Sequence, residues 1–130
     1  EESRRYISTR PVLYVPDVFR AKAADVKQGS GDEHPRSEFW KRAYIRDCEA
    51  AISAYELMLS DGVCPEQARF ILPQGVEVNW IWTGSLASYA RYYNQRSDSH
   101  AQKESQYLAA IIGAKMAELF PVSWKELTRA

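Results

Sequence analysis

Apolar and polar positions alternate with a helical period in the segment 38–60. An apolar residue recurs about every fourth position, at Trp40, Tyr44, Cys48, Ile52, Tyr55 and Leu59. This spacing predicts one long amphipathic helix. Asp61 and Gly62 follow it, and a glycine just past the last periodic residue is typical of a helix C-terminus. Pro65 and Glu66 then favour the start of a short second helix, which we expect to stop near Leu72 and Pro73.

The remaining segments predict two strands and two further helices. Strand-forming residues fill Tyr6–Val15 and Gln74–Thr83, whereas Ser85–Asn94 resumes a helical pattern with three tyrosines. From Ser99, a Ser-x-x-Gln capping box precedes a long apolar periodicity, so we expect a helix to begin there. The segment 22–37 is polar and aperiodic, which predicts a loop. Residues 1–130 are thus expected to form a single domain of helix-rich α+β class.

Charge and cysteine content narrow the range of partners. The chain carries 17 basic and 17 acidic residues, whereas polynucleotide binders normally show a basic excess. No apolar stretch approaches membrane-spanning length. Cys48 and Cys64 form no C-x-x-C pair, which suggests reduced thiols. We therefore expect a cytoplasmic protein that binds neither nucleic acid nor membranes.

Candidate chemistry gathers between Arg96 and Glu104. Arg96 and His100 flank the predicted helix start, where unpaired backbone N–H groups and positive charge suit an anionic or electron-rich ligand. The alternative is an ordinary solvated helix start. Arginine is also the only basic residue type between Lys41 and Lys103, and its planar fork suits phosphate and carbonyl recognition. Arg42 and Arg46 have acidic neighbours and are assigned to helix-surface pairing instead.

Several motifs in order resemble the flavin-dependent thymidylate synthases. They are the opening Glu1–Tyr6, the Glu-x-x-Arg helix of Glu66–Arg69 with Leu72 and Pro73, the aromatic segment Trp80–Thr83, the run Arg96–Gln102 with Glu104, and the closing Phe120, Pro121 and Trp124. The resemblance spans nearly the whole chain and implies that family's helix-rich domain with a small antiparallel sheet, here without the family's N-terminal part. The given sequence starts inside the family signature, so we expect the Arg-His-Arg element to come from a preceding segment or a partner chain.

The resemblance implies an activity and its cofactors. The reaction is the reductive methylation of dUMP to dTMP, with methylenetetrahydrofolate as carbon donor, FAD as flavin and NADPH as co-substrate. Members of the family are homotetramers whose sites are shared between subunits. The alternatives are a non-catalytic or split nucleotide-binding subunit of the family, which is expected to bind dUMP without flavin, and a related pyrimidine nucleotide hydroxymethylase.

The matched positions carry over a set of site residues. Arg96 is the candidate catalytic residue, contacting and polarising the pyrimidine. The residues implied for dUMP are Glu1, Ser3, Arg4, Arg5, Arg69 and Arg96. Those implied for FAD are Glu1, Ser85, Arg91, Gln95, Arg96 and His100.

Two features depart from the pattern or compete with it. Ser85, Ala87 and Arg91 stand where the family has asparagine, arginine and asparagine near the flavin, which makes flavin binding less certain than nucleotide binding. Asp98, His100 and Glu104 could be drawn as metal ligands, but without a second histidine or cysteine set we predict no metal. No triad pattern accompanies Ser3, so a nucleophilic role for it is disfavoured.

Overall fold

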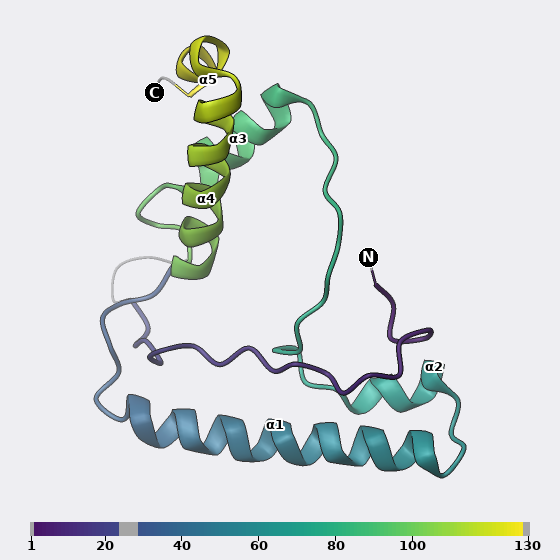
Figure 1. The fold of residues 1–130 in the computed structure, drawn as a ribbon. Coiled ribbons are helices and arrows are strands. Elements are labelled where there is room, and N and C mark those ends of the chain that lie inside the picture. The colour runs from purple at the N-terminus through teal and green to yellow at the C-terminus, as the bar shows by residue number, and fades with distance from the viewer. Residues whose placement is uncertain (1, 24–28, 129–130) are drawn as a thin grey trace. The chain divides into compact units, whose positions relative to one another are not determined.

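The computed structural model describes residues 2–23 and 29–128, which fall into two compact units. Unit 1 comprises Glu1–Phe19 and Glu33–Ile81, and unit 2 comprises Arg20–Asp32 and Trp82–Ala130. Figure 1 labels the helices of both units. Within the predicted loop 22–37, residues 24–28 lie outside the described residues, and the described part carries no helix before Ser37.

Unit 1 is built on α1 (Ser37–Ser60), which confirms the predicted long helix. Its buried face consists of Cys48, Ile52 and Tyr55, and Ala68 of α2 (Pro65–Ala68) is fully buried as well. The short 3-10 helix η1 (Arg69–Ile71) continues from α2. The predicted apolar stripe is therefore buried in the middle of α1, whereas Trp40 near its start stays about half exposed.

Gly62 ends α1 as the sequence predicted. The amide of Val63 donates to the Met58 carbonyl at 2.9 Å, and the Gly62 amide donates to Leu59 at 3.1 Å. These two bonds form a Schellman motif, which needs a left-handed residue, and Gly62 has φ +88°. The chain then enters α2, where Pro65 occupies the first turn.

The N-terminal chain runs antiparallel alongside α1 (Figure 1). Arg10 pairs with Glu49 and Glu56. Nearer the start of α1, Lys41 donates to the Asp17 carbonyl at 3.1 Å. Between them, the Tyr44 hydroxyl donates to the Tyr14 carbonyl at 2.9 Å. Side chains of α1 thus hold this segment where the prediction expected strand pairing.

The predicted small antiparallel sheet is not present among the described residues. Tyr6–Val15 and Gln74–Thr83 meet through one antiparallel bridge between Leu13 and Val76. Hydrogen bonds from Tyr14 to Gly75 (2.9 Å) and from Glu77 to Val12 (2.8 Å) flank it. The two predicted strands were therefore wrong for the described residues, because two segments that pair at one bridge without a further strand are marginal as a sheet.

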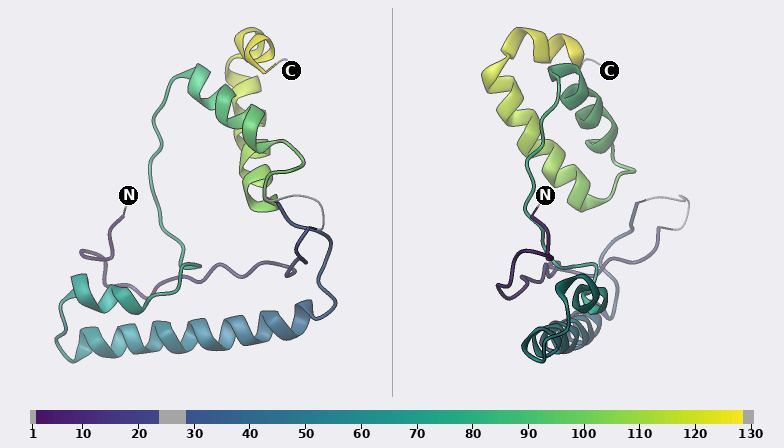
Figure 2. Two further views of the ribbon diagram at one scale, coloured as in Figure 1. Left: turned by 180° about the vertical axis from the view of Figure 1, so that it is seen from behind. Right: turned by 90° about the vertical axis from the view of Figure 1, so that its right-hand side faces the viewer.

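Unit 2 packs three helices: α3 (Leu86–Arg96), α4 (Lys103–Leu119) and α5 (Pro121–Leu127). Figure 2 shows α3 and α4 side by side. Small residues let the helices approach closely, because Ala90, Ala109 and Gly113 are buried at their contact. Trp124 of α5 closes this core, with its ring 5.4 Å from that of Tyr93.

The start of α4 differs from the prediction. The helix begins at Lys103, four residues after Ser99, and its N-cap Gln102 makes no side-chain cap bond. The side chain of Asp98 instead bonds the amide of His100 at 2.8 Å, and the Ala101 amide closes a turn on the Asp98 carbonyl at 3.0 Å. Aspartate competes for local backbone amides in this way, so a turn replaces the capping box.

Much of the outer surface of α4 and α5 is apolar. The exposed large apolar side chains here are Tyr107, Leu108, Ile111, Leu119, Phe120, Val122 and Leu127. Exposed apolar side chains gathered in this way are typical of an interaction surface. In the part of the chain that the structure describes, no helix combines the length and hydropathy needed to cross a membrane.

Candidate functional site

In unit 1 the predicted nucleotide residues Ser3, Arg4 and Arg5 lie in one tight turn. The Tyr6 amide donates to the Ser3 carbonyl at 2.9 Å, and Arg5 Nε donates to Ser3 Oγ at 3.2 Å. Arg4 donates to the Thr9 carbonyl at 2.6 Å, which satisfies one of its five N–H groups. The two guanidinium groups therefore keep most of their donors available. Glu1, the other residue predicted here, lies outside the described residues.

A contact that the sequence did not reveal anchors this turn. The Glu2 amide donates to the Asn79 carbonyl at 2.8 Å, and Asn79 Nδ2 returns a bond to the Glu2 carboxylate at 2.9 Å. A pocket of about 140 Å³ lies beside it, with Arg4 among its lining residues. This volume is well below the roughly 300 Å³ and more of typical ligand pockets, so it is too small for a whole nucleotide. The carboxylates of Glu2 and Glu77 also line it.

Arg69 opens η1 in the same unit. Its Nε donates to the Glu66 carbonyl at 3.4 Å, a weak local bond that leaves the rest of its exposed guanidinium unengaged by the described residues.

In unit 2, α3 carries three of the predicted ligand residues: Arg91, Gln95 and Arg96. All three are exposed, and their side chains make no hydrogen bond or ion pair with any residue that the structure describes. Arg91 and Gln95 are one helical turn apart and share a face. The C-terminal half of α3 thus presents several donors whose hydrogen-bonding capacity the described chain does not use.

Ser85, another predicted flavin residue, has a structural task. It is the N-cap of α3, where its Oγ accepts a hydrogen bond from the Ser88 amide at 3.2 Å. The same oxygen lies 3.0 Å from Ser88 Oγ. N-caps of this kind typically contribute about 1 kcal/mol to helix stability. The hydroxyl is therefore engaged within the helix start.

His100 lies in the turn before α4 and is tied to Asp98. Its amide and its Nδ1 both lie 2.8 Å from Asp98 Oδ1, and these bonds, the backbone one foremost, hold the pKa of the Asp98 carboxyl below its ordinary value. An ionised carboxylate only accepts hydrogen bonds, so Nδ1 carries the proton in this geometry. In the neutral form of the ring, Nε2 is then the acceptor.

The described arginines differ in whether they pair with a carboxylate. Arg10, Arg20, Arg42 and Arg46 each pair with a carboxylate, and Arg36 stacks 4.2 Å over the Phe39 ring. The five arginines predicted to bind ligands pair with no carboxylate among the described residues: Arg4, Arg5, Arg69, Arg91 and Arg96. Arg42 and Arg46 pair with acidic neighbours on the surface of α1, as the sequence predicted.

Comparison with known proteins identifies the family. A sequence model of the thymidylate synthase complementing protein family matches residues 1–122. The chain belongs to this family. It is 31% identical over 128 residues, 96% of its length, to the flavin-dependent thymidylate synthase of Kosmotoga olearia. It is 29% identical over 131 residues to that of Thermosipho melanesiensis and 30% identical over 125 residues to that of Thermus thermophilus, covering 99% and 95% of this chain.

Membership of the thymidylate synthase complementing protein family comes with partial coverage. The chain spans about half the length of the curated relatives it matches: 55%, 57% and 46% of the three proteins above. The predicted site residues divide between the two units. Ser3, Arg4, Arg5 and Arg69 belong to unit 1, and the others that the structure describes belong to unit 2. Among the described residues, no group of three or more histidine, cysteine, aspartate or glutamate side chains is arranged to hold a metal ion.

Proposed function

We propose that this chain forms part of a flavin-dependent thymidylate synthase. The reaction is the reductive methylation of dUMP to dTMP, with methylenetetrahydrofolate as carbon donor and NADPH as the source of reducing equivalents. The family membership and the names of the relatives support the proposal. In keeping with the family resemblance, the working enzyme is a homotetramer with sites shared between subunits, and the Arg-His-Arg element comes from a preceding segment or a partner chain.

The observation that carries this proposal is the set of five arginines without carboxylate partners. Arg10, Arg20, Arg42 and Arg46 pair with carboxylates, and Arg36 stacks on Phe39 instead. The five arginines that resemblance assigns to ligands have no carboxylate partner among the described residues, and of these Arg5 also lies 5.3 Å from the centre of the Tyr6 ring. Unpaired guanidinium forks suit phosphate oxygens and pyrimidine carbonyls, which accept bidentate hydrogen bonds.

The roles of these residues follow from their donors. Ser3, Arg4 and Arg5 offer hydroxyl and guanidinium donors from one turn to the nucleotide phosphate, and Arg69 adds a further cation. Arg96 donates to a pyrimidine carbonyl and stabilises the negative charge that develops there, which makes it the candidate catalytic residue. With Nδ1 held by Asp98, His100 presents Nε2 as a fixed acceptor.

The residues of unit 2 fit a flavin in part. Arg91, Gln95 and Arg96 offer exposed donors on α3, and the ring of His100 is 70% exposed. These groups suit the electron-rich carbonyls and the phosphates of FAD. When bound, the flavin supplies the hydride of the reaction. The protein's share is to hold the nucleotide ring and the folate in register against it.

A second function is favoured by the geometry at Ser85. Its hydroxyl is engaged in capping α3, and Ala87 offers no polar group where the family has an arginine. Two of the expected flavin contacts are thus weakened or missing. This observation supports a non-catalytic or split subunit that binds dUMP but holds no flavin.

Titration of the purified chain with FAD and dUMP separates the two functions. Visible flavin absorbance that stays with the protein and shifts on addition of dUMP supports the synthase. Binding of dUMP with no retained flavin supports the nucleotide-binding subunit. Failure to bind either ligand contradicts both.

A further inference from the structure

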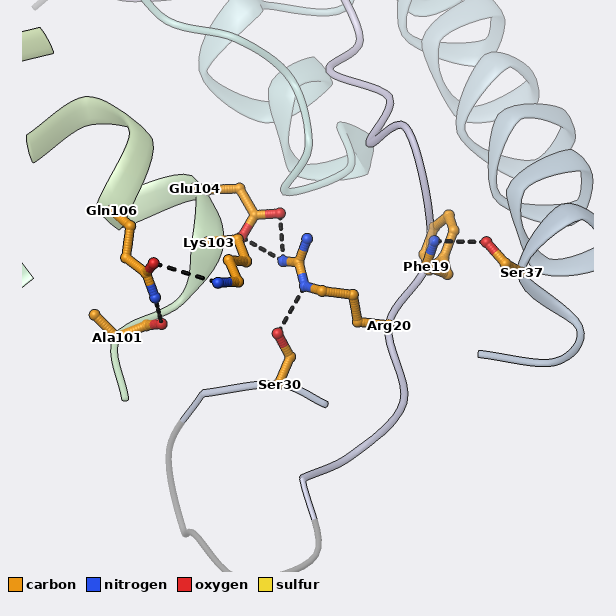
Figure 3. Close-up of polar contacts among 8 residues, drawn as sticks. All are labelled: Phe19, Arg20, Ser30, Ser37, Ala101, Lys103, Glu104 and Gln106. Carbon is orange, nitrogen blue, oxygen red and sulfur yellow. Dashed lines mark hydrogen bonds and ion pairs between the residues drawn. The ribbon is translucent and has the colours of Figure 1, made fainter. Parts of the chain in front are cut away.

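The turn that carries His100 is held by a residue that neither the motifs nor the resemblance singled out. Gln106, in the first turns of α4, donates to the carbonyl of Ala101 at 2.7 Å and to that of Ser99 at 3.3 Å (Figure 3). Together with Asp98, it ties the backbone on both sides of His100. Gln106 thus fixes the turn from the α4 side.

Gly29 also packs against the backbone of this turn. A Cβ placed on Gly29 would lie 2.7 Å from the His100 carbonyl oxygen, closer than real side chains approach. Gly29 also has φ +89°, a conformation that favours glycine. The backbone at residue 29 is therefore packed directly against His100.

Arg20 joins these two elements. Its Nη2 lies 2.6 Å from both carboxylate oxygens of Glu104 in α4, and its Nε donates to Ser30 Oγ at 2.6 Å (Figure 3). Ser30 directly follows Gly29 in the chain. The Arg20 side chain is only 20% exposed, so these charge-assisted bonds are shielded from water more than the other ion pairs of unit 2.

We propose that Arg20 is a positioning residue for the His100 turn. By bonding Glu104 and Ser30 at once, it holds Gly29 against the His100 carbonyl and so fixes the place from which His100 faces its ligand. The step from this geometry to a ligand rests on the proposed function. Arg20 itself touches no reacting atom in this role.

A lysine cannot replace the arginine fully. The two bonded partners lie on different nitrogens of one planar guanidinium, and the single ammonium of lysine reaches one of them at a time. Arg20→Lys therefore keeps the charge near Glu104 and releases Ser30, which separates positioning of the turn from simple charge neutralisation.

Hydrogen exchange of backbone amides tests the inference without needing a ligand. In Arg20→Ala we expect the hydrogen-bonded amides of His100 and Ala101 to exchange about tenfold faster, the effect of losing charge-assisted hydrogen bonds on a local opening equilibrium. Arg20→Lys is expected to give a smaller acceleration. The amides of α3 serve as the internal reference, and Arg42→Ala, which removes an exposed ion pair of α1, is the matched control. Unchanged exchange at His100 and Ala101 in Arg20→Ala overturns the proposal.

Global loss of structure has a distinct signature. If α3 accelerates as much as the turn in Arg20→Ala, the comparison is made on Arg20→Lys and Glu104→Gln. Faster exchange confined to the turn in those variants supports the inference, and equal rates at the turn and α3 contradict it.

Flavin binding by the same variants links the turn to the proposed function. If the unaltered chain binds FAD, Arg20→Ala is expected to weaken FAD binding about tenfold, which corresponds to the loss of one charge-assisted hydrogen bond. Arg42→Ala is expected to bind FAD as the unaltered chain does. A chain that binds no FAD, but whose turn loosens in Arg20→Ala, contradicts the flavin function and leaves the positioning of the turn supported. A chain that binds FAD equally well with and without Arg20 contradicts the inference alone.

Discussion

Tyr93 of α3 lies directly against Gly113 of α4. A Cβ built on Gly113 would lie 2.4 Å from Tyr93 Cε2 and 2.8 Å from Cδ2. The absence of a side chain at residue 113 is therefore what lets the tyrosine ring reach Trp124 and close the core of unit 2.

Replacing this glycine with alanine is expected to destabilise the protein. Helix propensity alone favours Gly113→Ala by about 1 kcal/mol, but overpacking a filled core typically costs about 1–3 kcal/mol. We expect a net loss of about 1 kcal/mol in the free energy of unfolding, measured by urea denaturation. In a Tyr93→Ala background the clash is absent, and the same substitution should stabilise. A stabilising Gly113→Ala in the unaltered protein would contradict this packing.

Two tyrosines on α1 should respond oppositely to loss of their hydroxyls. Tyr44 donates to the Tyr14 carbonyl, so Tyr44→Phe is expected to cost about 1 kcal/mol. The Tyr55 hydroxyl is buried with no partner among the described residues, and Tyr55→Phe is expected to be neutral or stabilising by up to about 1 kcal/mol. Thermal unfolding of the two single variants provides the comparison, and equal losses in both would refute the assignment.

Nucleotide binding should depend on the arginines that lack carboxylate partners. Arg69→Ala and Arg96→Ala are each expected to lose about 1.5–3 kcal/mol of dUMP binding, roughly ten- to a hundredfold or somewhat more. Arg42→Ala, which removes a paired arginine, is the matched control and should bind normally. Calorimetric titration of the three variants measures the differences. Unchanged affinity in both test variants would remove these arginines from the site.

Acid should weaken the protein partly through Glu104. Hydrogen bonds from Arg20 hold the pKa of this carboxyl below its ordinary value. The stabilisation is then fully present above the unfolded pKa of about 4.3 and is lost as pH falls through the lower folded value. We expect Glu104→Gln to be less stable than the unaltered protein at neutral pH but to lose less stability on acidification. Denaturation between about pH 5 and pH 3 tests this, with Glu118→Gln as the control for a surface pair.

The two histidines are expected in opposite neutral tautomers. His34 Nδ1 accepts a hydrogen bond from the Arg36 amide at 3.0 Å, which leaves its proton on Nε2. His100 places its proton on Nδ1 toward Asp98. Imidazole nitrogen chemical shifts in alkaline solution distinguish the two forms. Asp98→Ala should shift His100 toward the Nε2 tautomer and leave His34 unchanged, and identical tautomers in the unaltered protein would count against the Asp98 contact.

Sequence patterns predicted the elements that depend on residues close together in the chain. The apolar period of α1 and the glycine after it fix that helix and its Schellman end, because both depend on residues within a few positions of one another. The helix start predicted from the capping box at Ser99 was wrong, although this motif also depends on neighbouring residues. Asp98 offered the His100 amide a competing acceptor, and propensity alone cannot rank the two.

Sequence patterns could not predict contacts between residues that are far apart in the chain. Arg20 and Glu104 are 84 positions apart, and Glu2 and Asn79 are 77 apart, so no spacing rule could join them. The sheet was overpredicted because alternation indicates extended chain without showing how many strands are available to pair. Motif order identified the arginines of the candidate site, but only the structure shows which of them the described chain leaves without a carboxylate.

The apolar outer surface of α4 and α5 has a thermodynamic consequence. Burying a side chain such as Ile111 or Val122 fully contributes about 1.5–3 kcal/mol, and both are more than half exposed. Association that buries these side chains would therefore add to the stability of the folded protein. The midpoint temperature of unfolding should accordingly rise with the concentration of any partner that covers these residues.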